Sequence, residues 1–92
     1  MKIVKISSLG CPSCIIMNKV FNKIKENYSF DYEEFDYDFD ETDSFNAGNV
    51  MPVYIFYKNN KEVARLVGEH NFDEFSNLME KIKWKKLFIH YW

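Results

Sequence analysis

The sequence feature that most constrains the fold is the segment Gly10-Cys11-Pro12-Ser13-Cys14, where a strand pattern changes to a helix pattern. It holds the only two cysteines of the chain. A cysteine in the first turn of a helix faces the partial positive charge of the helix N-terminus, which favours the nucleophilic thiolate. The second cysteine, about one helical turn on, can attack a mixed disulfide formed on the first and close an internal disulfide. Pro12 suits a helix start, because its ring presets φ and its missing N–H needs no partner there.

A Cys-x-x-Cys pair can also be half of a zinc site, or simply two small residues of the core. Structural zinc usually needs four ligands, and the chain adds only His70 and His90, so a zinc site would mostly be one shared between two chains. A Cys-x-x-Cys pair beside a strand–helix–strand pattern, without an export signal, is typical of a redox motif. We therefore expect redox chemistry at Cys11 and Cys14, with no metal and no cofactor beyond their disulfide.

Length and composition set broad limits. The 92 residues predict one domain over residues 1–92, with a core over about 2–82 and residues 83–92 as a helix extension or tail. The net charge of −2 does not indicate a nucleic-acid binder. The sequence has no apolar run long enough for a membrane span, and no signal-peptide pattern follows Met1. We expect a cytoplasmic monomer, in which two cysteines would cycle rather than crosslink the fold.

Charge is unevenly distributed. Eight of the fourteen acidic residues lie between Asp31 and Asp43, and four lysines lie between Lys81 and Lys86. A solvated acidic edge with a basic helix end accounts for this pattern. A docking surface that selects partners by charge complementarity is the alternative.

The N-terminal half predicts a strand, a helix and a second strand. Residues 2–7 are β-branched, although Lys5 interrupts the apolar run. Residues 11–27 place apolar side chains at helical spacing, namely Ile16, Met17, Val20, Phe21 and Ile24. Residues 30–37 alternate aromatic and acidic side chains, and a slip at Glu33-Glu34 indicates a bulge or a register change.

The C-terminal half predicts a short element, a hairpin and a last helix. Residues 40–48 can form a short helix or an ordered loop. Residues 53–57 and 62–67 are strands joined by a tight turn whose asparagines tolerate positive φ. Asn71 is a good N-cap for a final amphipathic helix.

This order predicts an α/β fold, a four-stranded mixed sheet with helices on both faces. The first two strands should be parallel, because a helix joins them, and the last two should form an antiparallel hairpin. The cysteine motif then lies at the carboxyl end of a parallel strand, where open α/β sheets place their sites.

At this point the chain resembles the thioredoxin fold family over about residues 2–82. The segment Gly10–Cys14 resembles glutaredoxins, which carry Cys-Pro-Tyr-Cys after a short first strand. The segment from Met51 to Gly68 is similar to thioredoxins, in which a cis-proline opens a strand, residues like Phe-x-Asn-Gly form the turn and a glycine closes the next strand.

The resemblance implies roles for single residues. Cys11 matches the exposed nucleophile, Cys14 the less accessible resolving cysteine, and Pro52 the cis-proline beside the disulfide. Met51 matches the residue whose backbone pairs with a bound substrate peptide. A proline that merely starts an edge strand is the alternative for Pro52. The implied function is a thiol–disulfide oxidoreductase acting on protein substrates.

The departures from the family leave two questions open. Pro12 and Ser13 occupy the positions where thioredoxins have glycine and proline. Lys5 stands where many thioredoxins place a buried acid, and it could either lower the pKa of the thiols or point to solvent. Ser7-Ser8-Leu9 and the segment from Gly68 to Asn71 do not match the glutathione-binding segments of glutaredoxins. We therefore expect an upstream reductase as the electron donor, with glutathione as the alternative. The alternatives to the oxidoreductase function itself are a redox-inactive peptide-binding module and a metal-bridged dimer.

Overall fold

The structure, a computed structural model, describes residues 1–84. Its elements follow the predicted order, with a 3₁₀ helix, η1, in the segment that left helix or loop open. They are β1 (Lys2–Ser7), α1 (Pro12–Asn27), β2 (Asp31–Asp36), η1 (Asp43–Phe45), β3 (Val53–Lys58), β4 (Lys61–Val67) and α2 (Phe72–Trp84). The predicted extension over residues 83–92 lies outside the described residues from 85 onward.

The four strands form one mixed sheet in the order β2-β1-β3-β4. β1 and β2 are parallel, because α1 carries the chain from the end of one strand back to the start of the next. β1–β3 and β3–β4 are antiparallel. Asn59 and Asn60 both have positive φ in the β3–β4 turn, which confirms the predicted hairpin.

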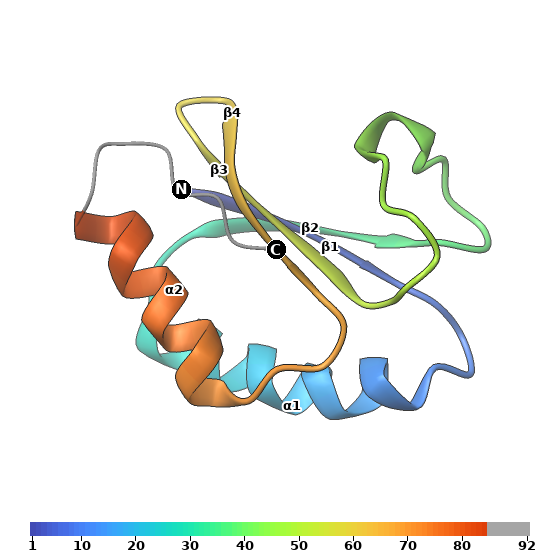
Figure 1. Cartoon of the computed structure of the whole chain (residues 1–92), viewed down its shortest axis with the longest axis horizontal. Coiled ribbons are helices and arrows are strands. Elements are labelled where there is room, and N and C mark those ends of the chain that lie inside the picture. The colour runs from blue at the N-terminus through green and yellow to red at the C-terminus, as the bar shows by residue number, and fades with distance from the viewer. Residues whose placement is uncertain (85–92) are drawn as a thin grey trace.

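Both α-helices cover the same face of the sheet (Figure 1). Phe75 of α2 lies at the centre of this core, with its ring 5.0 Å from Tyr54, 5.6 Å from Phe56 and 6.1 Å from Phe21. The opposite face is apolar too, with Val4, Ile6, Val53 and Ile55 buried beneath side chains that include Phe35 and Phe45. Helices therefore lie on both faces, but on the second face the helix is the single turn η1.

The slip at Glu33-Glu34 is not a bulge. β1 and β2 stay in one register along their whole length, with Lys5 opposite Glu34. Glu34 takes a helix-facing position because it forms an ion pair with Lys5 on the neighbouring strand. Phe35 then faces the other core, as strand alternation requires. The irregularity in the sheet instead lies at Phe56/Tyr57, between β3 and β4.

One of the apolar positions predicted for the buried face of α1 is wrong. Ile16 is 48% exposed, whereas the buried row is Cys14, Met17, Phe21 and Ile24. These positions follow the three- and four-residue spacing of one helix face, and the cysteine begins the row. The buried row thus begins within the cysteine motif, and Cys14 lies at the end of the core nearest the N-terminus of α1.

The described residues include no helix that is long and apolar enough to cross a membrane.

Candidate functional site

Cys11 is the N-cap of α1. Its backbone is extended, with φ −94° and ψ 109°, and Pro12 follows as the first helical residue. The Cys11 sulfur accepts a hydrogen bond from the backbone N–H of Cys14 at 3.2 Å. Gly10 has φ +71°, a conformation that glycine adopts without strain, and so turns the chain from the loop into the helix. The sulfur therefore lies at the positive end of a 16-residue helix.

The two thiols differ in their exposure. Both cysteines are free, and Cys11 is partly exposed while Cys14 is 4% exposed. Burial raises the pKa of the Cys14 thiol, and the hydrogen bond with Cys11 adds to this rise. The Ser8 backbone and the charge of Lys5 act in the opposite direction on the same pKa. The arrangement offers one accessible sulfur and one protected sulfur one helical turn behind it.

Met51 and Pro52 lie beside the motif, 40 positions along the chain from it. The Cys11 sulfur lies 3.8 Å from the Met51 carbonyl oxygen, to which its S–H donates. The Met51–Pro52 peptide bond is cis, and Pro52 is fully buried at the entry to β3. The Pro52 carbonyl accepts the Gly68 N–H at 2.8 Å. The sheet thus brings together the two segments that carry the family resemblance.

The other predicted site residues lie around this pair. Pro12 is exposed at the helix start, and the Ser13 hydroxyl donates to the Glu69 carboxylate at 3.3 Å. Glu69 was not predicted from the sequence, because the contact depends on the path of the loop that follows β4. Lys5 is 5% exposed, so it does not point to solvent; it faces the core below α1. Within the described residues, no group of three or more His, Cys, Asp or Glu side chains could hold a metal ion.

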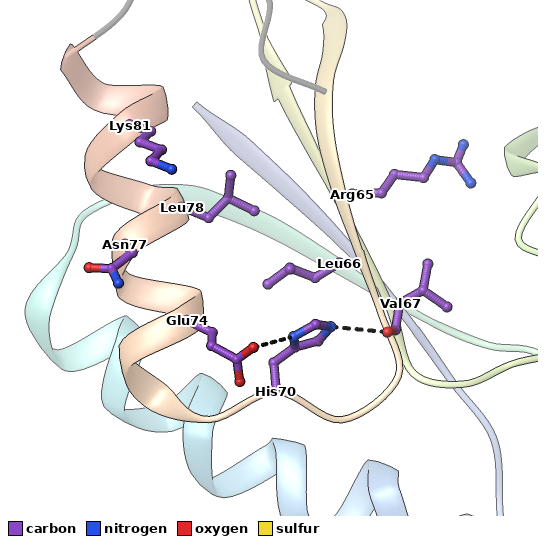
Figure 2. A pocket seen from close by; sticks show the side chains of 8 residues that line it. All are labelled: Arg65, Leu66, Val67, His70, Glu74, Asn77, Leu78 and Lys81. Carbon is purple, nitrogen blue, oxygen red and sulfur yellow. Dashed lines mark hydrogen bonds and ion pairs between the residues drawn. The ribbon is translucent and has the colours of Figure 1, made fainter. Parts of the chain in front are cut away.

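A hollow that no cysteine lines lies between β4 and α2. Its volume is about 410 Å³, and Figure 2 shows His70 and Glu74 at one end, with Leu66 and Leu78 along its wall. The His70 ring is held between the Glu74 carboxylate at 3.3 Å and the Val67 carbonyl at 3.1 Å.

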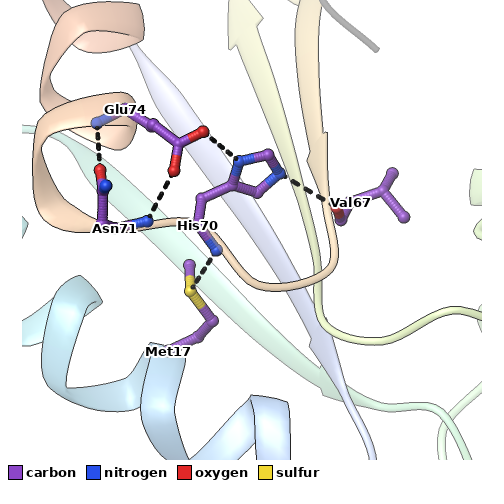
Figure 3. A network of polar contacts seen from close by, with 5 residues as sticks. All are labelled: Met17, Val67, His70, Asn71 and Glu74. Carbon is purple, nitrogen blue, oxygen red and sulfur yellow. Dashed lines mark hydrogen bonds and ion pairs between the residues drawn. The ribbon is translucent and has the colours of Figure 1, made fainter.

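The loop between β4 and α2, which carries His70, forms hydrogen bonds with both helices. The His70 N–H donates to the Met17 sulfur of α1 at 3.2 Å (Figure 3). Asn71 and Glu74 exchange hydrogen bonds at the start of α2, with the Glu74 N–H on the Asn71 side chain and the Asn71 N–H on the Glu74 carboxylate. This is a capping box, and it fixes the segment that carries Glu69 toward the motif.

Comparison with solved structures finds several proteins with a similar fold. Thioredoxin-2, a component of the malaria parasite protein secretion machinery, superposes with a TM-score of 0.79 at 19% identity over 87% of this chain and 81% of its own. The Schistosoma mansoni thioredoxin pre-protein gives 0.75 at 24% identity, over 96% and 78%. Thioredoxin 1 from Thermosipho africanus gives 0.71 at 24% identity, over 90% and 94%. No family model and no curated protein matches the sequence.

Proposed function

The chain has the thioredoxin fold, and we propose that it is a thiol–disulfide oxidoreductase that acts on protein disulfides. The observation that carries the proposal is the cap of α1. A partly exposed Cys11 sulfur accepts a hydrogen bond at the helix N-terminus, and the buried Cys14 thiol lies one turn behind it. This pairs an accessible nucleophile with a protected resolving thiol, as disulfide exchange requires.

The reaction has two exchange steps. The Cys11 thiolate attacks one sulfur of a substrate disulfide, and the other substrate sulfur leaves with the electron pair and takes up a proton. The Cys14 thiolate then attacks the Cys11 sulfur, so the mixed disulfide breaks, the Cys11–Cys14 bond forms and the second substrate thiolate is released. The substrate gains two electrons, the cysteine pair is oxidised, and no bound cofactor takes part.

The surroundings of Cys11 favour a polypeptide substrate. Leu9, Ile15 and Val50, which flank the motif and Met51 in the sequence, are 71%, 63% and 55% exposed. We propose that these exposed apolar side chains, close in sequence to the motif and to Met51, contact apolar side chains of a polypeptide substrate. The Met51 backbone is the proposed strand partner for the substrate, since the Pro52 carbonyl already binds Gly68.

After each reaction, a donor must supply two electrons to reduce the Cys11–Cys14 disulfide again. An upstream reductase is the leading donor in the proposal, and glutathione is the alternative. The compartment we propose is the cytoplasm, where such a pair cycles between dithiol and disulfide.

Trapping tests the exchange mechanism. In a Cys14→Ser variant the first step proceeds and the second cannot, so protein partners should accumulate as mixed disulfides on Cys11. Cys11→Ser is the matched control, because it keeps Cys14 and the fold but removes the nucleophile. A folded Cys14→Ser protein with a reactive Cys11 that trapped no partner would instead favour a redox-inactive peptide-binding module.

Equilibration in redox buffers, followed by thiol alkylation, measures the reduction potential of Cys11–Cys14. A value below roughly −250 mV fits a thioredoxin-like reductant, and one above about −200 mV fits a glutaredoxin-like or oxidising role. If no internal disulfide forms at any redox poise, the oxidoreductase proposal fails, and a metal-bridged dimer or a binding module replaces it.

A further inference from the structure

Lys5 is a charged residue in a place that favours apolar side chains. It lies in the middle of β1, on the same face of the strand as fully buried Ile3, and it is 5% exposed. Removing an ammonium group from water is unfavourable unless partners compensate. An apolar residue of similar length would continue the core without that cost. Stability alone therefore does not account for a lysine at this position.

Three groups surround the Lys5 ammonium. Glu34 of β2 lies 3.1 Å away, Asn18 of α1 accepts a hydrogen bond from it, and the centre of the Phe21 ring lies 5.5 Å away. The Glu34 side chain is about half exposed, so the carboxylate remains partly in water while the ammonium does not. The positive charge is held in one place beneath α1.

Two of the residues that contact Lys5 lie on the same face of α1 as Cys14. Asn18 follows Cys14 by four positions and Phe21 by seven, and such residues share one face of a helix. The ammonium therefore lies beside the turns of α1 that follow Cys14, close enough for its charge to act on the Cys14 thiol. Its charge lowers the pKa of Cys14, against the larger effect of burial.

Other titratable groups also face Cys14. Cys11 lies above it at the helix cap, and Tyr54 of β3 stands opposite Lys5 in the sheet register. Burial raises the pKa of Tyr54, so the phenol stays neutral at pH 7 and adds no charge. Glu34 opposes Lys5 in sign but is half exposed, which weakens its effect at a distance.

We propose that Lys5 is a positioning residue for the second exchange step, in which its buried ammonium stabilises the Cys14 thiolate that attacks the mixed disulfide. This inference rests on the proposed oxidoreductase function. Cys14 releases its proton to solvent, its thiolate forms the bond to the Cys11 sulfur, and the substrate sulfur departs with the electron pair. Glu34 and Asn18 hold the ammonium in place.

The direct test measures the ionisation of Cys14 by thiolate absorbance in a Cys11→Ser background, where it is the remaining thiol. Lys5→Met should move the titration midpoint up by about one pH unit, the smaller end of the effect of a nearby opposite charge. Lys2→Met is the matched control, because Lys2 pairs with Glu33 across the same two strands at 3.2 Å but is 44% exposed. An unchanged midpoint in Lys5→Met, or an equal shift in Lys2→Met, would overturn the proposal.

A kinetic test uses the mixed disulfide with thionitrobenzoate, whose release from Cys11 reports the attack by Cys14. At pH 7, Lys5→Met should lose about threefold in rate, because tenfold less thiolate is partly offset by its greater nucleophilicity. As the pH rises, the difference in release rate between Lys5→Met and the native protein should narrow and then reverse. A merely structural effect would slow the reaction by one factor at every pH, and that result would contradict the inference.

Glu34→Gln is a second variant, in which residue 5 remains a lysine and the glutamine side-chain oxygen can still accept a hydrogen bond from its ammonium. It removes the opposing charge, so the Cys14 midpoint should move down, by less than the rise in Lys5→Met. A rise in Glu34→Gln would overturn the assignment. The ionisation measurements need no substrate disulfide, so they succeed or fail independently of the trapping experiment that tests the oxidoreductase function.

Discussion

The backbone N–H of Cys14 donates a hydrogen bond to the sulfur of Cys11 across 3.2 Å. One atom therefore serves both as the cap of α1 and as the proposed nucleophile. In the mixed disulfide that we propose, this sulfur stays at the helix N-terminus, one turn from the Cys14 thiol. The fold thereby holds these two sulfurs near each other in the free protein.

The difference in exposure predicts unequal reactivity. Iodoacetamide should modify Cys11 faster than Cys14, on the order of tenfold, because Cys14 is 4% exposed and its pKa is raised by burial. Peptide mapping by mass spectrometry after brief labelling measures the ratio. In urea the two rates should become similar. Preferential labelling of Cys14 in the folded protein would contradict the assignment of roles.

The cap predicts a stability difference between two substitutions of one residue. Cys11→Ser keeps a side-chain acceptor for the Cys14 N–H, and Cys11→Ala removes it. The alanine variant should unfold at lower urea concentration than the serine variant, with a free energy of unfolding lower by about 1 kcal/mol. Equal stability of the two variants would show that the sulfur does not cap α1.

Local patterns in the sequence were sufficient to predict the strands, the helices and the hairpin. Asn59 and Asn60 were predicted to form a tight turn and Asn71 to cap a helix, and both features depend on residues close together in the sequence. The two cysteines were likewise predicted to lie at the junction of a strand and a helix. These features need no knowledge of which strands are adjacent.

The features that sequence reasoning missed depend on distant pairs. The charge of Glu34 looked like a break in strand alternation, because its partner Lys5 is 29 positions away and is adjacent only in the β1–β2 register. Glu69 approaches Ser13 across 56 positions. Ile16 was misassigned to the core because Cys14 was counted as a reactive residue and not as the start of the buried row.

The buried hydroxyl of Tyr54 has no hydrogen-bond partner among the described residues. Tyr54→Phe removes this unsatisfied group, so the free energy of unfolding should stay level or rise by about 1 kcal/mol. Tyr28→Phe is the matched substitution, since the Tyr28 hydroxyl bonds to Ser76 at 2.7 Å and Glu80 at 2.6 Å, and it should cost about 1 kcal/mol. Urea unfolding measures the free energy of unfolding of both variants. An equal decrease in Tyr54→Phe and Tyr28→Phe would contradict the prediction.

The capping box at α2 predicts a dependence of stability on pH. The hydrogen bond from the Asn71 backbone N–H has the largest effect on the pKa of Glu74, and the hydrogen bond with His70 has the next largest. Both hold this pKa below its ordinary value of 4.5. A lowered pKa means that the folded state binds this proton more weakly than the unfolded state. The stabilisation by Glu74 is therefore fully present above pH 4.5 and is lost as the pH falls through the lower folded value.

Glu74→Gln removes the charge that this dependence requires. The variant should be less stable than the native protein at pH 7, and the difference should shrink on acidification below pH 4.5, as measured by urea unfolding across the pH range. Asp73→Asn, in the same first turn of α2, controls for loss of a negative charge at a helix N-terminus. If both variants showed the same pH dependence, the effect would belong to the helix dipole and not to the bond between Glu74 and Asn71.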